Sequence, residues 1–515
     1  MTNTNDYDAE IAIVGYGPTG VTAANRLGAY GIKTIVFERE KEIYPRARAV
    51  TVNDWTCRYF QAMGVNREIK QTMDETYQLR WITYDGVELN KISFPPSDQG
   101  HARAYSIYQP AMEQVLRDSM TRYSNRVDVQ FGQDVVGIAQ DENGVTLTIR
   151  DMDTGATRTM RARYLLGCHG GNHATREELG VELVGDTTET RWVVIDARVK
   201  RWWPHRNILT FWSDKNRPVV DIALAKGNHR WEFPLESHET DEDFQTHEDL
   251  WKLLNTLGVT HDDVEIHQHA FYNHHVRHAE NWRLGRVFLL GDAAHLMPPW
   301  GGSGMQSGIR DAFCLAWKLA NVLKGKLPEQ VLDTYQAERA PDVARYTQIT
   351  IELGKIIQQQ LSDEEMAALQ KAALEDNSGL HPLLQPPVLA GGWITGACDE
   401  NSALGRLIPQ PRAASSRGVY ALLDDFLGDD MVLLGDGVAP ETHLSEAQRA
   451  DWDELGTRYI RVHGADEATE RASDIVDLEG SLLGWMRQYG TRVIAVRPDR
   501  FVAATDTTGL DVPLS

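Results

Sequence analysis

The chain has 515 residues and is acidic, with 74 Asp and Glu against 52 Lys and Arg, a formal net charge of −22 at pH 7. Apolar residues make up 42% and charged residues 24%, which is typical of a globular protein and excludes a disordered or fibrous one. The negative charge disfavours nucleic acid and anionic membranes as partners, because both would repel the chain. At roughly 150 residues per domain, the length predicts about two to four domains.

The four cysteines, Cys57, Cys168, Cys314 and Cys398, are isolated, with no CxxC pair and no metal-ligand spacing. This pattern predicts reduced thiols and no disulfide framework. The polar start lacks a secretory signal pattern, and no apolar run reaches about 18 residues, so we expect neither export nor a membrane span. Together these features predict a cytoplasmic protein.

The first predicted unit is a strand at 10–14, a glycine turn, a helix and a second strand at 34–37 that ends at Glu38. The turn contains Gly15, Gly17, Pro18, Thr19 and Gly20. In such a unit the first glycine allows the tight turn, the second lets the backbone approach a pyrophosphate, and the third allows helix and strand to pack closely. An acid about 20 residues further on is placed to accept hydrogen bonds from ribose hydroxyls. The unit predicts dinucleotide binding, and its acid favours FAD or NAD over NADP.

Further along, residues 127–149 have the pattern of strands broken by an Asp-Glu-Asn-Gly turn, and a short apolar strand ends at Gly167. From about 181 to 280 the sequence is rich in Trp, Val, Thr and His and lacks long helical periodicity. This change in composition and periodicity predicts an inserted sheet domain.

A buried strand at 286–290 then precedes a helical stripe over 308–324 and more helix over 330–360. Residues 376–412 are rich in Gly and Pro and predict a linker, and the chain restarts near 413 with short strands and helices. The predicted boundaries are 1–180 and 281–375 for the dinucleotide-binding domain, 181–280 for the inserted sheet, 376–412 for the linker and 413–515 for the last domain.

A second glycine-rich stretch, which begins at the end of the strand 286–290, decides between FAD and NAD. Asp292 at the end of this strand can accept hydrogen bonds from a polyol such as ribityl. The stretch continues with Pro298, Gly301, Gly302, Gly304 and Met305. Its glycines let backbone amides approach a flat ring, and the helix that starts near Met305 would stabilise a reduced, anionic isoalloxazine with its positive end. Combined with the first unit, this stretch favours FAD.

At these residues the chain resembles the flavoprotein aromatic hydroxylases of the para-hydroxybenzoate hydroxylase type. The matching motifs are GYGPTG at 15–20, PRARAV at 45–50, the Gln-Pro helix start at 109–110, RWEF at 230–233 and GDAAHLMPPWGGSGMQSGIRDAFCLAWKL at 291–319. RWEF and the Gln-Pro start look most like the 3-(3-hydroxyphenyl)propionate hydroxylase branch. The sequence VRPDRFVA at 496–503 is similar to the end of the thioredoxin-like domain of that branch. Without a CxxC pair this domain is unable to perform dithiol chemistry.

The resemblance implies an α/β fold with a doubly wound FAD-binding domain, an inserted antiparallel β-sheet substrate domain and a C-terminal thioredoxin-like domain. It also implies that NADH or NADPH reduces the FAD, that O2 forms a flavin C4a-hydroperoxide, and that the distal oxygen passes to a phenol ring. The expected partners are a small aromatic substrate and O2, and relatives commonly form homodimers. A phenolic acid is the favoured substrate. Hydroxylation or epoxidation of a larger polyketide or heteroaromatic compound stays open, as does a flavin-binding protein with impaired NAD(P)H turnover.

By their place in the matching motifs, Gln109 and Asp292 are expected to bind FAD together with the residues of the two glycine-rich stretches. Arg46 or Arg48 is expected near the pyrophosphate, and the doubled Arg-Ala leaves open which one takes this role. The chain departs from the family after Gly167, where His169 replaces an Asp, and Asn172 and His173 replace an Arg and a Ser. We therefore expect altered use of NAD(P)H.

Six histidines cluster late in the predicted inserted sheet, at 261, 267, 269, 274, 275 and 278. A metal site is one interpretation, but their spacing lacks a helical HExxH pattern or a Cys partner. Polar histidines on the faces of a sheet are the favoured interpretation, and no metal is predicted. Tyr272 and His274 are the candidates for activating a phenol, because their strand precedes the return to the FAD-binding domain.

Overall fold

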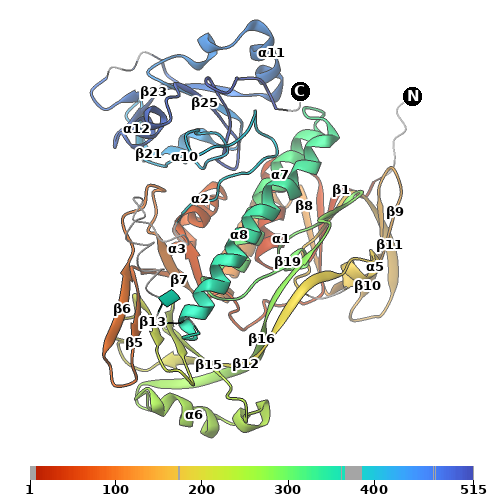
Figure 1. The fold of residues 1–515 in the computed structure, drawn as a ribbon. Helices are drawn as coiled ribbons and strands as arrows, with labels where there is room; N and C mark the ends of the chain where they lie inside the picture. The colour runs from red at the N-terminus through yellow and green to blue at the C-terminus, as the bar shows by residue number, and fades with distance from the viewer. Residues whose placement is uncertain are drawn as a thin grey trace.

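The computed structural model describes residues 7–171, 174–360, 362, 364–365, 385–467, 469 and 471–513. Two eight-stranded sheets, a seven-stranded sheet and a small three-stranded sheet organise them. Figure 1 shows the long helix α8 running from the blue C-terminal part at the top towards the yellow and green sheet at the bottom. None of the described helices combines the length and the apolar character needed to cross a membrane.

The first sheet carries the predicted dinucleotide-binding turn. In spatial order its strands are β17 (Arg283–Leu284), β18 (Val287–Leu289), β11 (Thr157–Gly167), β1 (Ala9–Val14), β2 (Thr34–Glu38) and β8 (Val127–Phe131), with β10 (Val145–Asp151) and β9 (Gln133–Gln140) attached to β11. The strands from β18 to β8 run parallel, so their carboxyl ends meet at one edge, where such sheets bind ligands. The turn after β1, Glu38, the residues after Gly167, and Asp292 all come to this edge.

Helices cover this sheet and join it to the rest of the chain. They are α1 (Pro18–Ala29), α2 (Asp54–Ala62), α3 (Asn66–Lys70), α4 (Gln109–Ser119), η1 (Met120–Tyr123), α5 (Ala174–Glu178), η3 (Gly291–Ala293), α7 (Ser303–Leu323), η4 (Glu329–Asp333) and α8 (Thr334–Ile357). Helix α1 begins with Pro18, which suits the first helical position because its missing N–H would have no partner there. Its fully buried residues Val21, Ala24 and Leu27 pack with α7 in the largest apolar core.

The second eight-stranded sheet is the predicted inserted sheet, and it is larger than 181–280. In spatial order it contains β19 (His295–Leu296), β16 (Val264–Ala279), β12 (Leu183–Val199), β15 (Asn228–Pro234), β14 (Val219–Leu224), β13 (Ile208–Trp212), β5 (Gln78–Ile82) and β6 (Glu88–Ser93). Strand β5 joins through a parallel pair with β13, and the Trp81 and Phe211 rings stack 5.0 Å apart. The remaining pairs are antiparallel.

The two faces of this sheet have different partners. One face packs on α6 (His247–Thr256), which the sequence analysis did not expect, around Trp231, Phe233, Leu250 and Leu254. The short helix η2 (Asp241–Phe244) precedes α6, and a three-stranded sheet of β3 (Thr51–Asn53), β7 (Ala104–Ile107) and β4 (Met73–Thr76) lies elsewhere in the chain. The opposite face of the eight-stranded sheet packs against the end of α8 and lines the cavity described below.

The C-terminal part has the thioredoxin-like arrangement. Its sheet runs in the order β21 (Tyr420–Leu422), β20 (Arg412–Ser415), β24 (Ile475–Asp477), β23 (Arg458–Gly464), β22 (Val432–Asp436), β25 (Val493–Val496) and β26 (Val502–Thr505). Strands β22 and β23 are parallel and β25 is antiparallel to β22. The helices of this part are α10 (Leu423–Leu427), η6 (Pro440–His443), α11 (Glu446–Leu455) and α12 (Ser481–Gln488).

The predicted linker 376–412 is only partly described, since 376–384 lie outside the described residues. From 385 onward the segment is packed, with Trp393, Leu404 and Ile408 fully buried. The indole of Trp393 contacts those of Trp317 and Trp452, so it sits between the two parts of the chain. The described part of the predicted linker is therefore packed against both parts of the chain.

Buried ion pairs join the C-terminal part to the FAD-binding part. Asp424 accepts from Arg58 of α2 and pairs with Arg500, at distances of 2.8 and 3.1 Å. Glu338 of α8 accepts from Arg497 at 2.7 Å and lies 2.8 Å from Lys318. The two cations hold the pKa of Glu338 well below its usual range despite its burial. The Cys314 thiol donates to Glu338 at 3.2 Å, and Asp499 accepts from Arg497 at 2.6 Å. These three potential metal ligands therefore already have protein partners.

Candidate active site

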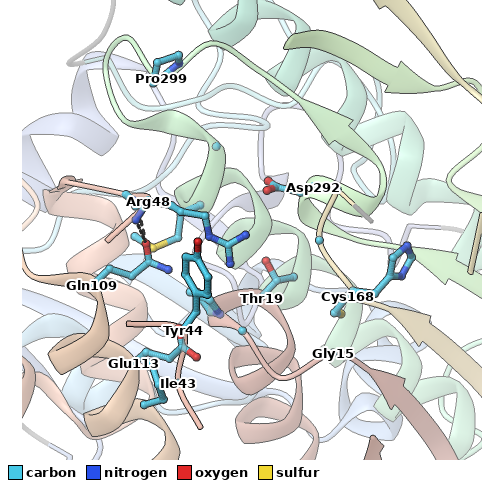
Figure 2. Close-up of a pocket in the computed structure, with 18 of the residues that line it drawn as sticks. Gly15, Thr19, Ile43, Tyr44, Arg48, Gln109, Glu113, Cys168, Asp292 and Pro299 are labelled. Atoms are coloured by element: carbon cyan, nitrogen blue, oxygen red, sulfur yellow. Dashed lines mark hydrogen bonds between the residues drawn. The ribbon is translucent and has the colours of Figure 1, made fainter. Parts of the chain in front are cut away.

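A cavity of about 860 Å³ opens at the carboxyl edge of the parallel sheet and extends to the inserted sheet. Its dinucleotide end is lined by the turn after β1, the end of β2 and the start of α4, and Figure 2 shows this end. Its aromatic end is lined by Leu209, Phe211, Val220, Glu232, Trp300 and Ile357. The cavity is within the upper range of small-molecule and cofactor sites.

The surroundings of each glycine in the first turn explain why a side chain is absent there. Gly15 has a φ of +96°, and a Cβ there would lie 2.5 Å from the carbonyl oxygen of Cys168. A Cβ at Gly20 would collide with the carbonyl oxygen of Gly15. Gly17 has nothing within 4 Å of its ideal Cβ, so its missing side chain leaves space open in front of α1. The free N–H groups at this helix start, with no acidic residue in the first turn, suit a phosphate.

Glu38 is held in a fixed orientation at the end of β2. Its carboxylate accepts a hydrogen bond from the Tyr16 backbone N–H at 2.7 Å and another from the Glu40 backbone N–H at 2.8 Å. The side chain lines the cavity, where a carboxylate can accept from ribose hydroxyls. Arg117 also lines this end and donates to the Tyr16 carbonyl oxygen at 3.1 Å.

Gln109 fixes the backbone of the arginine-containing loop. It is buried, and its side-chain oxygen accepts from the backbone N–H groups of Arg48 at 2.9 Å and Ala49 at 2.7 Å. Figure 2 shows the Arg48 guanidinium reaching into the space between Gln109 and Asp292. Arg48 lines the cavity and Arg46 is not among its lining residues. The geometry favours Arg48 for the role that the sequence left open between the two.

The second glycine-rich stretch forms the opposite wall. Asp292 and all five of the residues expected to face the flavin line the cavity, namely Pro298, Gly301, Gly302, Gly304 and Met305. Helix α7 begins at Ser303, two residues before the expected start, with Gly302 as a left-handed N-cap at a φ of +63°. A Cβ at Gly302 would collide with the Thr51 hydroxyl oxygen, so glycine is required here for space as well.

A buried network supports the turn that carries Asp292. Asp311 of α7 accepts from the Gly291 backbone N–H at 3.0 Å, contacts a ring nitrogen of His295 at 2.8 Å, and accepts from Arg339 at 2.8 Å. Burial raises the pKa of Asp311, but His295 and Arg339 outweigh burial and lower it to about 2. Asp311 therefore stays ionised, and His295 has a structural role.

The two phenol-activating candidates lie behind the cavity wall. Neither Tyr272 nor His274 is a lining residue; the Tyr272 hydroxyl donates to Glu232 at 2.8 Å. Burial and the neighbouring Glu232 raise the pKa of Tyr272 well above 10, so it remains protonated. Burial lowers the pKa of His274 to about 4, so its ring is neutral at pH 7. It stacks on Trp192 and meets Trp300 edge-on.

Glu232, the glutamate of the RWEF motif, is a lining residue that the sequence pattern alone does not identify as part of the site. Strand β15 is buried along its whole length, so a carboxylate within it has to be compensated by neighbours or used by a ligand. That conflict between burial and charge is the signal that could have identified it.

The segment that departs from the family lies at the end of β11. Cys168, His169, Gly170 and Gly171 line the cavity, whereas Asn172 and His173 lie outside the described residues. Arg176 is almost fully buried and donates to the carbonyl oxygens of Ala293 at 3.2 Å and Gly171 at 3.0 Å. It ties this segment to the turn that carries Asp292.

The residues around the cavity fit FAD. The N-terminus of α1 and the Arg48 guanidinium offer positive charge for a pyrophosphate, whereas Arg39 and Arg117 line the same end but pair with Glu40 and Glu113. The N-terminus of α7 lies at the opposite wall, among the residues expected to face the flavin ring. Glu38 and Asp292 offer acceptors for hydroxyl groups, and the glycines beside α7 leave a surface that a flat ring can approach. The apolar residues beyond this surface leave room for an aromatic molecule next to that ring.

Residues 8–350 match the model of the family described as FAD binding domain, and residues 405–511 match the HcaD C-terminal domain. A 3-(3-hydroxyphenyl)propionate/3-hydroxycinnamic acid hydroxylase of Burkholderia vietnamiensis is 33% identical over 99% of this chain and 96% of the relative. The chain belongs to the family of FAD-dependent aromatic hydroxylases. The hydroxylase of the same name from Comamonas testosteroni is 31% identical over 96% of this chain and 94% of its own. The expected family and the FAD cofactor are thereby confirmed, and the protein is an FAD-dependent aromatic monooxygenase.

Solved structures confirm the fold. The flavin-dependent monooxygenase PieE, described in complex with FAD and substrate, matches with a TM-score of 0.82 and 21% identity over 98% of this chain and 97% of its own. Aklavinone-11 hydroxylase, described in complex with FAD and aklavinone, matches with a TM-score of 0.79 and 23% identity over 99% of this chain and 97% of its own. Both monooxygenase structures thus share the overall fold of this chain over nearly its whole length.

Proposed function

We propose that this monooxygenase hydroxylates a phenolic acid of the 3-(3-hydroxyphenyl)propionate type, with NADH or NADPH as reductant and O2 as oxidant. The observation that carries the proposal is one continuous cavity with a dinucleotide end and an aromatic end. The names of relatives that match nearly the whole chain support this substrate class. The reaction places one oxygen atom of O2 on the ring, reduces the other to water and oxidises the nicotinamide.

The residues of the chain bind and orient the reactants. FAD, when bound, supplies the activation of O2 that no side chain can provide. Gly17 and the start of α1 hold the pyrophosphate, Glu38 the ribose, and Arg48 the phosphates or the incoming nicotinamide nucleotide. Asp292 holds the ribityl chain, and the backbone from Pro298 to Met305 holds the ring.

The aromatic end keeps water away from the reacting atoms. Trp300 is buried against Trp192, with ring centroids 5.0 Å apart, and Ile357 at the end of α8 closes the same cluster. A dry pocket is required because an activated oxygen species is lost to side reactions when water reaches it.

The proposal includes a cytoplasmic location and a homodimer. The four cysteines are free, and three of them are buried, as expected for a reducing compartment. Light scattering of the purified holoenzyme measures the assembly, and a monomeric mass would remove the dimer from the proposal.

Anaerobic reduction of the holoenzyme tests the proposal. NADH and NADPH are each mixed with the yellow protein in a stopped-flow instrument, with and without 3-(3-hydroxyphenyl)propionate and simpler phenols. We expect one nucleotide to bleach the flavin, and a phenolic acid to accelerate this bleaching. Equal rates with every additive would remove the phenolic acid from the proposal. If neither nucleotide reduces the flavin, the nicotinamide step leaves the proposal, and the substituted segment that begins at His169 becomes the first cause to test.

A further inference from the structure

Strand β15 places two buried charged side chains on the face of the inserted sheet that faces the cavity. Arg230 and Glu232 are two residues apart, so their side chains lie on the same face. Arg230 is 4% exposed and Glu232 is 7% exposed, and Glu232 lines the aromatic end. Both charges therefore need partners within the protein or in a ligand.

Arg230 has its own compensation. Its guanidinium donates twice to Asp196 of β12, at 2.8 and 2.9 Å, and also to the carbonyl oxygen of Ala47. Asp196 in addition accepts from Gln268 of β16 at 3.0 Å. Arg230 and Asp196 therefore compensate each other's charge without Glu232. The Arg230 guanidinium lies 3.8 Å from the nearer Glu232 oxygen.

Glu232 is only half compensated. The Tyr272 hydroxyl donates to its Oε2 at 2.8 Å. Its Oε1 faces Arg230 at 3.8 Å, which is beyond hydrogen-bond range, and accepts from no other described residue. One carboxylate oxygen at the cavity wall is thus available to a donor that enters with the ligand.

Among the described residues, no positively charged side chain lines the aromatic end. The cations among the cavity-lining residues are Arg39, Arg48 and Arg117, and all three belong to the dinucleotide end. Around Glu232 the lining side chains are apolar, with Val220 directly opposite it on β14. In this poorly solvated setting a substrate carboxylate would be repelled by Glu232, whereas a hydroxyl group would be attracted as a donor.

We propose that Glu232 accepts the phenolic hydroxyl of the substrate through Oε1, so that the substrate enters hydroxyl-first with its acid group directed away from the inserted sheet. Tyr272 and Arg230 are positioning residues that orient the Glu232 carboxylate. This inference deepens the proposed function and rests on a phenol being the substrate.

The chemistry follows from this contact. As the new C–O bond forms and the O–O bond of the activated oxygen breaks, the phenolic proton moves to Glu232 and the electron pair of the phenolic O–H bond enters the ring. Glu232 then returns its proton to the phenolic oxygen. The hydrogen of the attacked carbon leaves as a proton, which is taken up by the departing oxygen that becomes water. A positioned base contributes about 10²- to 10⁴-fold to a proton transfer of this kind.

The groups that act on Glu232 set its protonation. Burial raises the pKa of Glu232 above its ordinary value, Arg230 and the Tyr272 hydrogen bond act against that rise, and Asp196 adds to it. A raised carboxyl pKa means that the basic form is lost as the pH falls through that pKa. Hydroxylation is therefore expected to decline on the acidic side of the pH profile.

The first test is binding, measured from the perturbation of the flavin absorbance in the oxidised holoenzyme. It compares 3-(3-hydroxyphenyl)propionate, 3-propylphenol without the acid group, and 3-phenylpropionate without the hydroxyl. We expect the dissociation constants of the two phenols to agree within about tenfold. We expect 3-phenylpropionate to bind at least tenfold more weakly, because it loses one hydrogen bond to a charged group. Equal binding of 3-phenylpropionate would overturn the inference. Because this arm needs no turnover, it decides the inference even if none of the phenols is hydroxylated, which would refute the proposed function instead.

The second test uses two variants and a matched control. Glu232→Gln is expected to lower kcat for hydroxylation at least 100-fold and to remove the acidic limb of the pH profile, with FAD content unchanged. Tyr272→Phe is expected to keep this limb but move it to higher pH, because the lost hydrogen bond had lowered the Glu232 pKa. Glu236→Gln, at a carboxylate next to the same strand that pairs with Arg217 at 3.0 Å, is expected to change neither. An unchanged acidic limb in both Glu232→Gln and Tyr272→Phe would overturn the proposal.

Discussion

Replacing Asp424 by Asn is predicted to loosen the C-terminal part from the FAD-binding part. Asp424 accepts from the Arg58 guanidinium at 2.9 and 2.8 Å and lies 3.1 Å from the Arg500 guanidinium. The side chains of all three residues are at most 4% exposed. An Asn keeps the shape but removes the charge, which leaves two buried guanidinium groups without their shared anion.

The expected loss is about 3–5 kcal/mol, the range for breaking a buried ion pair by removing one partner. This is a large share of a typical unfolding free energy of about 5–15 kcal/mol. Urea unfolding of the holoenzyme followed by tryptophan fluorescence is the assay, because Trp393 contacts both Trp317 and Trp452 where the two parts meet. We expect the first transition of the variant to move to lower urea concentration.

The pH dependence of this loss has a defined sign. Burial raises the pKa of Asp424, but Arg58 and Arg500 outweigh burial and lower it to about 2. A carboxyl group with a depressed pKa in the folded state stabilises the fold above its unfolded pKa, about 3.9, and this contribution is lost as the pH falls towards 2. The difference between wild type and variant is therefore expected to be full at pH 7 and to shrink below about pH 4.

The matched control is Asp153→Asn, which removes the anion of an exposed pair. The Lys41 and Asp153 side chains are 59% and 66% exposed, so solvent already screens their attraction. We expect almost no change in the unfolding transition of this variant. Equal transitions for the two Asn variants would refute the view that buried charges hold the C-terminal part in place.

Three glycines give further predictions. Gly17→Ala is expected to leave unfolding of the apoprotein unchanged, since no atom beyond the adjoining residues lies within 4 Å of the new methyl group, but to weaken FAD binding at least tenfold in a fluorescence titration. Gly20→Ala is expected to lower both stability and FAD binding, because its methyl group would collide with the Gly15 carbonyl oxygen. Unchanged FAD affinity in both variants would contradict the placement of the cofactor. Gly354→Ala places a methyl group 2.6 Å from the Trp300 indole nitrogen, and we expect a higher KM for the aromatic substrate with normal FAD content. An unchanged KM would show that this indole does not shape the substrate end.

The parts of the fold with strong local signals could be predicted from the sequence. The turn from Gly15 to Gly20 and the strand that ends at Glu38 are contiguous, so steric and hydrogen-bonding requirements appear within one short stretch. The stretch after Asp292 is equally local, because a strand end, a glycine turn and a helix start follow one another. Both could be predicted because the chemistry of a dinucleotide site depends on backbone geometry near the site.

Features that depend on distant pairing could not be predicted in this way. Strand β5 joins the inserted sheet through Trp81 and Phe211, far apart in sequence, and nothing near β5 identifies β13 as its partner. The role of Glu232 depends on Tyr272 of another strand and on the position of the cavity. The packing of the chain from residue 385 onward could not be predicted either, because Gly and Pro content indicates the absence of helix and strand and carries no information on packing.

Turnover under ¹⁸O2 tests directly whether the protein inserts an oxygen atom of O2 into a phenol. The holoenzyme is supplied with 3-(3-hydroxyphenyl)propionate and the nicotinamide nucleotide that reduces it, and the products are analysed by mass spectrometry. We expect a dihydroxylated product that carries one ¹⁸O atom, with one nicotinamide oxidised for each product molecule. Complete recovery of the reducing equivalents as hydrogen peroxide, with no labelled product from this or any other phenol, would contradict it.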